Sequence, residues 1–141
     1  KKGEAVASLF PDDVVLSTDT IVCLDGKIYG KPKDRKDAYN TLATFSGMTH
    51  EVVSGVSIIS KKLNMTMYVK SNVTFKKLTQ KMIDDYLETN EPYDKAGSYA
   101  IQGEGRNLIE GYSGSLDNIV GLPIEYIKDM LRVILNEVEN R

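Results

Sequence analysis

The fold is decided by HEVVSGVSIISKKLNMTMYVKSNVTF, residues 50–75. Valine, isoleucine, threonine and tyrosine, which fit a pleated strand well, recur over residues 50–60 and again over residues 65–75. The polar KKLN at residues 61–64 separates the two stretches, as a connection between strands does. We therefore predict two long strands in succession.

Shorter elements precede this pair. Residues 13–24, DVVLSTDTIVCL, are rich in β-branched residues, and the Asp-Gly at 25–26 is a strong hairpin signal leading into KIYG. Asp34 can cap a helix over residues 35–46, for which Gly47 provides a C-terminal stop. We expect a strand, a hairpin turn and then a helix before residue 50.

Further elements follow it. Thr79 can cap a helix over residues 80–90. We predict strands near 98–102 and 106–112, then a Gly/Ser/Asn loop, and a last helix for which Pro123 suits the first turn. Strands outnumber helices, but the two kinds of element are interleaved. The pattern predicts an α/β (α+β) fold, with a mixed central β-sheet and flanking helices.

Composition limits the size and the class of the protein. A chain of 141 residues with 41% hydrophobic content can bury one core, so we expect a single domain over residues 1–141. Charge is nearly balanced, with 18 Lys and Arg against 20 Asp and Glu. Because non-specific nucleic-acid binding needs clustered cations, we expect no nucleic-acid partner.

Cysteine content and hydropathy indicate the compartment. Cys23 is the single cysteine, so no disulfide can form within the chain, and we expect it as a small buried side chain in a reducing compartment. No apolar run reaches the length of a membrane span, and no signal peptide stands at the start. We expect a cytoplasmic protein without a membrane partner.

The first ten residues, KKGEAVASLF, look like the end of a helix that has lost its beginning. Apolar residues occur at helical spacing before Pro11, yet no N-cap signal stands upstream of them. We expect that an N-terminal part is missing from this sequence.

Two short polar stretches are candidates for chemistry. STDT at residues 17–20 interrupts apolar sequence, and Asp19 there can hold a hard cation such as Mg²⁺ or simply end a strand. Lys31, fixed between Gly30 and Pro32, can reach a phosphate oxygen or remain a solvated turn lysine. The residues alone leave both alternatives open.

A third candidate is EPYDKAGSYAIQG, residues 91–103, which suits neither a strand nor a helix. Asp94 and Lys95 can pair with each other on the surface, which contributes little to stability. Gln102 carries an acceptor and donors, as reading a nucleobase edge requires, or it ends a strand. His50 has no second histidine or cysteine beside it, so we expect a structural hydrogen bond there and no zinc site.

The order of these stretches carries a resemblance. STDTIVCLDG, GKP, SGMTHEV, DKAGSYAIQG and NIVGLP follow one another as in the Maf family of nucleoside triphosphate pyrophosphatases, across nearly the whole length. Thr18 stands where the family usually has alanine, and Ile119 where it has valine. Family members begin earlier, with a strand leading into a Ser-Pro-Arg-Arg motif. The resemblance therefore implies a Maf/inosine-triphosphatase-like fold truncated at its N-terminus.

It also implies an activity and roles for particular residues. The reaction would be hydrolysis of a nucleoside triphosphate between its α and β phosphates, assisted by a divalent metal, Mg²⁺ or Mn²⁺. Asp19 matches the catalytic aspartate, as general base or metal ligand, and Lys2 and Lys31 match phosphate-contacting lysines. The loop of residues 91–103, with its Asp94 and Lys95, would hold the base and sugar.

The branch of the family follows from the same loop. DKAG and IQG resemble the branch that hydrolyses dTTP and UTP, and Thr20 and Gln102 match positions associated with that choice. The implied role is housekeeping of the nucleotide pool, and a homodimer is a possible assembly. The alternative is a regulatory module of cell division that binds a nucleotide without turnover.

Overall fold

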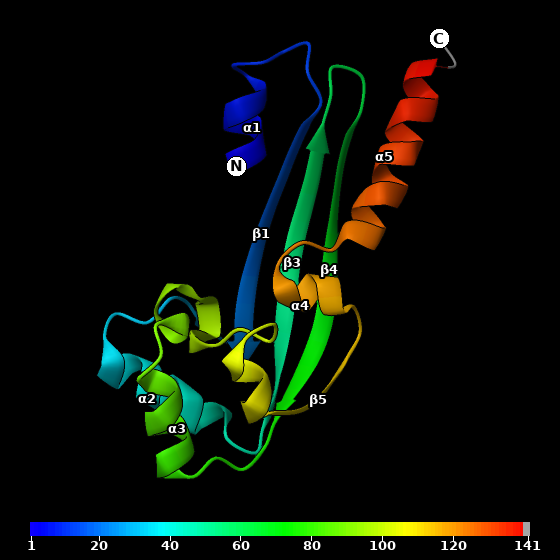
Figure 1. Cartoon of the computed structure of the whole chain (residues 1–141). Helices are drawn as coiled ribbons and strands as arrows, with labels where there is room; N and C mark the ends of the chain where they lie inside the picture. Colours follow the sequence, from blue (N-terminus) through cyan, green and yellow to red (C-terminus); the bar gives the residue numbers. More distant parts are fainter. Residues whose placement is uncertain (140–141) are drawn as a thin grey trace.

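The computed structural model describes residues 1–139 as an elongated molecule built along one sheet (Figure 1). In spatial order the strands are β2 (Lys27–Tyr29), β1 (Val15–Leu24), β3 (Thr49–Ile59), β4 (Asn64–Phe75) and β5 (Ile109–Ser113). The two long strands expected on either side of KKLN are confirmed as β3 and β4. The single domain expected over 1–141 stays a prediction, and residues 140–141 of it lie outside the described residues.

The predicted α/β (α+β) class is confirmed, but the sheet is antiparallel throughout residues 1–139 and not mixed. The reason lies in how the strands are connected. The crossover through the helix after β2 does make β2 and β3 run in the same direction, yet β1 lies between them and opposes both. The β1–β2 and β3–β4 connections are short, which only antiparallel neighbours allow.

The helices lie on both faces of the sheet. They are α1 (Lys2–Ala7), α2 (Arg35–Phe45), α3 (Gln80–Leu87), α4 (Leu116–Val120) and α5 (Ile124–Glu139), with short 3₁₀ turns η1 (Glu91–Asp94), η2 (Ala96–Ser98) and η3 (Glu104–Leu108). Figure 1 shows α1 and α5 on either side of the long strands. Among these helices of residues 1–139, none combines the length and the apolar character that crossing a bilayer requires.

Local sequence signals explain where several elements begin and end. Asp25 and Gly26 adopt φ values of 50° and 78° between the paired Leu24 and Lys27, as a two-residue hairpin of twisted strands requires. The Asp34 carboxylate accepts a hydrogen bond of 2.8 Å from a backbone amide in the first turn of α2. The hairpin and the helix cap predicted from the sequence are both confirmed.

The strand predicted near 98–102 is wrong. Gly97 and Ser98 have φ values of 75° and 62°, a left-handed backbone that cannot continue a ladder. The chain passes through η2 there, and η3 then delays β5 until Ile109. Residues 98–102 therefore form part of a loop, and their side chains lie beside the sheet and not within it.

Two apolar clusters pack on the same face of the sheet. The larger one joins β1, β3 and β4 to α2 and α3, with Leu42, Phe45 and Phe75 fully buried. The smaller one packs Val56 and Ile58 of β3 against Ile127, Met130 and Ile134 of α5. Both clusters use every second residue of β3, as the alternation of a strand requires. The opposite face carries α1, where Gly3 packs against Ser17 and Ile59.

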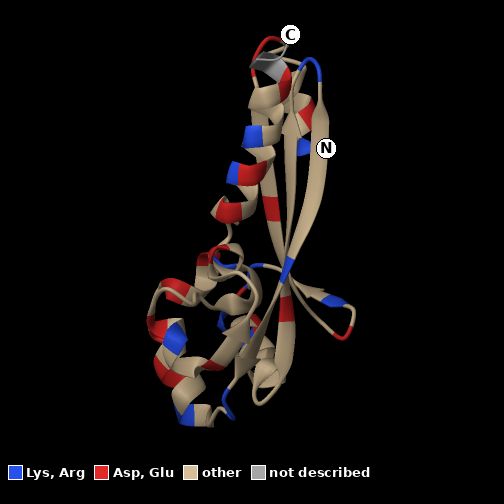
Figure 2. Ribbon diagram, turned by 90° about the vertical axis from the view of Figure 1, so that its right-hand side faces the viewer, with Lys and Arg blue, Asp and Glu red and all other residues tan. Residues whose placement is uncertain are grey.

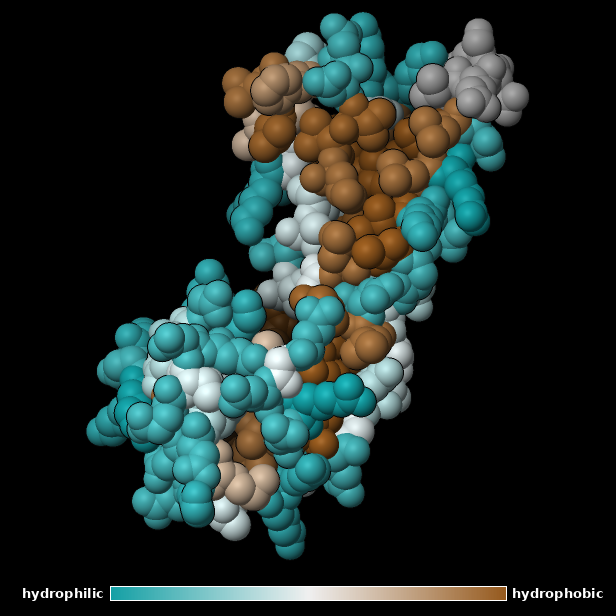
Figure 3. Space-filling model, viewed as in Figure 1, coloured by the Kyte–Doolittle hydropathy of each residue, from teal (hydrophilic) through white to brown (hydrophobic). Residues whose placement is uncertain are grey.

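The surface is mixed in charge and uneven in polarity. Acidic and basic residues are interspersed along the described chain (Figure 2). Apolar side chains gather on the face seen in Figure 3, between α1 and α5, and Leu9, Phe10 and Leu16 are among the exposed apolar residues of the molecule. β2 pairs only with residues 22–24 of β1, so within residues 1–139 the outer edge of β1 has no partner strand over residues 15–21.

Candidate functional site

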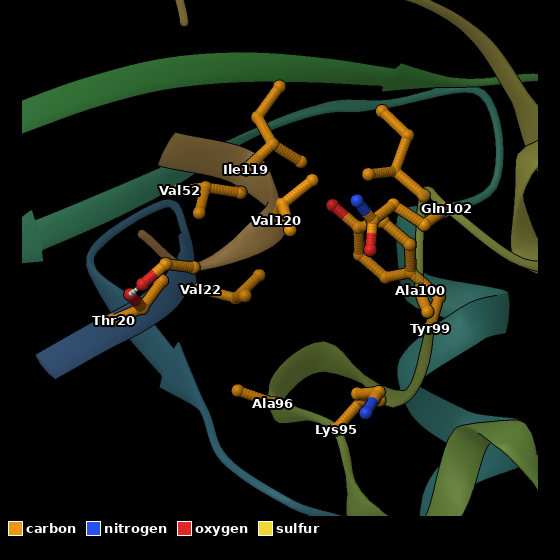
Figure 4. Close-up of a pocket in the computed structure, with 12 residues that line it drawn as sticks. Thr20, Val22, Val52, Lys95, Ala96, Tyr99, Ala100, Gln102, Ile119 and Val120 are labelled. Carbon is orange, nitrogen blue, oxygen red and sulfur yellow. Dashed lines mark hydrogen bonds between the residues drawn. The ribbon is translucent and has the colours of Figure 1, made fainter. Parts of the chain in front are cut away.

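A cavity of about 210 Å³ lies where β1, the loop of residues 95–102 and α4 meet (Figure 4). Three of the residues predicted to bind substrate line it: Thr20, Lys95 and Gln102. Figure 4 shows Thr20 and Gln102 on opposite sides of the cavity. The remaining lining is mostly apolar and comprises Val22, Val52, Ala96, Tyr99, Ala100, Ile101, Ile119, Val120 and Gly121. An apolar cavity with a few polar groups is the usual form of a small-molecule site.

Thr20 is held in place by polar contacts on two sides. Its Oγ1 lies 2.7 Å from Oγ of the fully buried Ser54 on β3, and it lies 3.3 Å from the carbonyl oxygen of Gly121, to which it can donate. Sequence reasoning missed Ser54, although a serine in an apolar alternating strand is a signal that could have found it. The contacts tie the strand wall of the cavity to the α4 wall.

Asn118 fixes the α4 wall and was also missed. Its side chain is fully buried, and its Nδ2 donates to the carbonyl oxygens of Val52 at 3.1 Å and Val69 at 3.0 Å. Gly121 follows α4 with a φ of 119°, which a residue with a side chain rarely adopts. The asparagine that begins NIVGLP was the available signal.

Tyr99, in the loop of residues 95–102, is held by a contact with His50 of β3. The Tyr99 hydroxyl and His50 Nε2 are 2.7 Å apart, and the His50 ring stacks on Phe45 with centroids 4.2 Å apart. Burial lowers the pKa of His50 to about 4, so the imidazole is neutral at pH 7. The structural hydrogen-bonding role predicted for His50 is confirmed.

Asp19 does not reach this cavity. Its Oδ1 lies 3.4 Å from Nζ of Lys2 in α1, and both side chains are largely exposed. Successive side chains of a strand point to opposite faces, so Thr20 faces the cavity whereas Asp19 faces α1. The structure thus brings Lys2 to Asp19 but separates this pair from the cavity by the thickness of one strand.

Lys31 and Asp94 also lie outside the cavity lining. Lys31 is exposed in the turn after β2, in a hollow that it shares with Lys27 and Lys33. Asp94 Oδ2 lies 3.4 Å from Nζ of Lys95, an exposed pair of the kind expected. A backbone hydrogen bond from Gly97 to the residue before Lys31 does join the two loops, at 3.2 Å.

Metal ligands are sparse in the part of the chain that the structure describes. Within it no three His, Cys, Asp or Glu side chains converge to hold an ion by themselves. Asp19 offers a single accessible carboxylate on an open surface. Mg²⁺ is commonly bound by one or two carboxylates together with substrate phosphates, so this donor fits such an ion only in company with a ligand.

The fold is that of an α/β protein whose antiparallel sheet carries a cavity beside β1 and α4. The sequence model of the Maf-like protein family matches residues 1–134. The chain belongs to the Maf-like protein family.

Curated relatives carry a consistent name. A dTTP/UTP pyrophosphatase of Clostridioides difficile (strain 630) is 47% identical over 134 residues, which cover 94% of this chain and 69% of the relative. One of Bacillus pumilus (strain SAFR-032) is 48% identical over 124 residues, 88% of this chain and 66% of the relative. One of Latilactobacillus sakei subsp. sakei (strain 23K) is 44% identical over 132 residues, 94% and 73% of the two chains. This chain therefore spans about two thirds of the length of such relatives.

Proposed function

We propose that this chain carries the nucleoside site of a nucleoside triphosphate pyrophosphatase that hydrolyses dTTP and UTP to the monophosphate and pyrophosphate. Relatives at 44–48% identity are named for that activity. The observation that carries the proposal is the cavity in which Thr20, Lys95 and Gln102 come together from distant parts of the chain. Removal of surplus or non-standard pyrimidine nucleotides is the corresponding role.

The cavity suits a single-ring base. At about 210 Å³ it is smaller than the roughly 300–1,000 Å³ of sites for drug-sized ligands. The Gln102 amide presents one carbonyl acceptor and an NH₂ donor, which complement the O4 and N3–H edge of uracil or thymine. Cytosine presents its donor and acceptor in the reversed order. A fixed Gln102 amide would therefore discriminate against CTP.

The open edge of β1 offers a path for the phosphates. A base held beside Thr20 lies one residue from Asp19, and at residues 15–21 the outer edge of β1, opposite β3, has no partner strand in the described structure. The triphosphate would cross this edge toward Asp19 and Lys2. There Asp19 accepts a proton from the attacking water, and Lys2 and Lys31 neutralise phosphate oxygens.

A divalent cation, Mg²⁺ or Mn²⁺, belongs to the same proposal. Such an ion supplies neutralisation of the polyphosphate charge, and Asp19 is the carboxylate of this chain that would hold it. Hydrolysis at the α phosphorus needs positioned water and stabilised negative charge, but no covalent nucleophile. The accessible Asp19 and the nearby Lys2 provide groups of these two kinds.

The setting of the enzyme is proposed on sequence grounds. A cytoplasmic location agrees with Cys23 as a free thiol, and the interspersed charges of the described chain agree with a protein that has no nucleic-acid partner. A homodimer without a membrane partner is the proposed assembly. Light scattering on the purified protein as its gene encodes it would decide between monomer and dimer.

The deciding experiment compares turnover with binding. Pyrophosphate release from dTTP, UTP, CTP and the purine triphosphates is measured with Mg²⁺, in the protein as its gene encodes it. Equilibrium binding of the same nucleotides is measured in parallel. Release from dTTP and UTP above CTP supports the proposal. Tight binding of a pyrimidine nucleotide with no release from any triphosphate would instead establish the regulatory module.

A further inference from the structure

Two side chains outside the cavity fasten the loop that carries Gln102. Glu91 lies in η1 and Tyr86 in α3, and the Tyr86 hydroxyl donates to Oε2 of Glu91 at 2.6 Å. The same oxygen accepts from the backbone N–H of Gly105 at 2.8 Å, and Oε1 accepts from that of Glu104 at 3.0 Å. One carboxylate thus receives three hydrogen bonds, two of them from the chain just after Gln102.

The Tyr86 hydroxyl extends the arrangement to the other side of Gln102. It accepts a hydrogen bond of 3.2 Å from the backbone N–H of Ala100, a residue that lines the cavity. Gln102 is therefore bracketed by an anchor two residues before it and another two to three residues after it. Both anchors end on the Tyr86–Glu91 pair.

The space around the pair is filled, which explains two glycines of the loop. A Cβ added to Gly103 would overlap Oε1 of Glu91, so any side chain there would expel the carboxylate. A Cβ on Gly105 would lie 2.6 Å from the Ala100 carbonyl oxygen and 2.8 Å from the Tyr86 hydroxyl. The sequence IQGEG thus has glycines where the carboxylate and the phenol need room.

Tyr86 is suited to act as a permanent donor. Its ring is buried in the larger apolar cluster, with 4% of its surface exposed. Burial and the hydrogen bond to Glu91 raise the pKa of the phenol, which stays protonated at every working pH. The hydroxyl can therefore donate to Glu91 while it accepts from Ala100.

We propose that Tyr86 and Glu91 are positioning residues for base selection, which hold the backbone of residues 100–105 so that the Gln102 side chain extends from one fixed place beside the cavity. The inference rests on the proposed function, because it explains how that site tells uracil and thymine from cytosine. A loop that shifts would carry the Gln102 amide away from the base edge that it pairs with. A loop with a fixed backbone keeps that amide within reach of the O4 and N3–H edge of uracil or thymine.

The first experiment measures kcat/KM for UTP and CTP in the protein as its gene encodes it. Tyr86→Phe removes both the donor and the acceptor of the hydroxyl, and Glu91→Gln replaces one acceptor oxygen by an NH₂ group. Each should lower the preference for UTP over CTP on the order of 10-fold, through slower use of UTP, as loss of a polar pairing implies. Tyr93→Phe is the matched control, since that hydroxyl donates to the Leu87 carbonyl oxygen at 2.8 Å and touches neither anchor. The preference of the Tyr93→Phe protein for UTP over CTP should be unchanged.

A double variant separates positioning from general weakening of the fold. If Tyr86 acts through Gln102, adding Tyr86→Phe to Gln102→Ala should leave the UTP to CTP ratio at the value of Gln102→Ala alone. Independent, multiplicative effects on that ratio would overturn the inference. So would an unchanged ratio in folded Tyr86→Phe and Glu91→Gln proteins, or a wild-type protein that hydrolyses CTP as well as UTP.

A measurement that does not depend on turnover tests the positioning role of Tyr86 and Glu91 separately from the proposed pyrophosphatase activity. Hydrogen exchange of the Ala100 and Gly105 amides, in the protein as its gene encodes it, should speed up at least 10-fold in Tyr86→Phe, relative to Tyr93→Phe. Absence of pyrophosphate release in the wild type would reject the proposed function, and the UTP to CTP ratio of dissociation constants would then test the positioning in place of kcat/KM. Unchanged exchange at both amides would reject the positioning whatever the activity.

Discussion

Asp19 and Thr20 are adjacent in the chain, yet their side chains leave β1 on opposite faces. Thr20 reaches Ser54 and the cavity, whereas Asp19 reaches Lys2 on α1. Because the outer edge of β1 is open at this point in the described structure, one ligand can touch both faces by passing around the edge. Under the proposed function, this arrangement would divide recognition of the base from chemistry on the phosphates between two consecutive residues.

Asp19→Asn tests the chemical half of that division. Turnover of UTP should fall on the order of 10²- to 10³-fold, the scale for losing one positioned electrostatic group. The free energy of unfolding should hardly change, since the amide matches the carboxylate in size and the exposed pair with Lys2 contributes little. Steady-state kinetics and urea unfolding of the same preparation check both statements, and wild-type turnover in a folded Asp19→Asn protein would remove Asp19 from the mechanism.

His50 makes stability depend on pH. Burial lowers its pKa from 6.5 to about 4, so between these values the unfolded chain binds a proton that the folded protein does not. The free energy of unfolding therefore decreases as pH falls from 6.5 toward 4, by roughly 3 kcal/mol from this residue. Urea unfolding at several pH values measures the slope.

The variant His50→Gln provides the control for this pH dependence. It removes the titrating group and offers an amide to the Tyr99 hydroxyl, so its stability should vary less than that of the wild type between pH 6.5 and 4. Carboxylates titrate in both proteins, and the difference between the two curves isolates His50. Parallel curves would show that the imidazole does not titrate differently on folding.

At the scale of elements, one side chain of the five-residue helix α4 fixes it to the sheet. A helix of this length is not stable alone. The Asn118 amide secures it by donating to carbonyl oxygens of β3 and β4, beneath the cavity wall formed by Ile119 and Gly121. The position of that wall is therefore set by the long strands.

Asn118→Ala should destabilise the protein by about 2–3 kcal/mol, because it leaves two buried carbonyl oxygens without this donor and opens a small void. KM for UTP should also rise, since the Gly121 carbonyl next to Thr20 loses its support. Asn136→Ala, at an exposed position of α5, is the matched substitution and should change neither quantity appreciably. Equal stability of the two variants would mean that packing alone holds α4.

The elements that could be predicted from the sequence are those whose signals come from residues next to one another in the chain. The hairpin at Asp25 and Gly26 and the cap at Asp34 depend on residues next to them, and both appear where the sequence placed them. The strand expected at 98–102 failed because Gly97 and Ser98 turn the backbone left-handed, in a loop fastened by partners outside it.

The candidate site shows the same limit. Thr20, Lys95 and Gln102 were named from motif order, and the cavity unites them. Asn118 was not named, because its partners Val52 and Val69 lie far away in the sequence and only the fold brings them near. Nor could the sequence show that Asp19 faces away from the cavity until the register of β1 was known.

At the scale of the whole molecule, the sheet runs between two ends. The end that contains the cavity has a mostly hydrophilic surface, and the other end has an apolar surface between α1 and α5 (Figure 3). The cavity borders the larger cluster, and α5 packs on the smaller one. Asp19 pairs across the sheet with Gly55 of β3, the strand whose Val52 belongs to the larger cluster and whose Val56 belongs to the smaller one. The proposed phosphate path is therefore the least enclosed part of the site.

Because Asp19 lies on an open surface, we expect pyrophosphate release to depend on added metal. A chelator should abolish pyrophosphate release, and Mg²⁺ should restore it, because the Asp19 carboxylate and the triphosphate are both negative and need a cation between them. Without nucleotide, Mg²⁺ should bind weakly, since the described residues gather no cluster of ligating side chains. Calorimetric titration of Mg²⁺ with and without a non-hydrolysable UTP analogue checks this, and tight binding to the free protein would contradict it.

The long β3–β4 hairpin has a consequence for the order of folding. Its strands are joined through a compact turn in which Ser60 both donates to the Leu63 carbonyl oxygen and accepts from the Leu63 amide. Closing this turn constrains few residues, whereas pairing β1 with β3 must first close the long excursion through β2 and α2. We therefore predict that this hairpin forms first in the sheet, and that the cavity forms last, when α4 and the loop of residues 95–102 pack onto the paired strands.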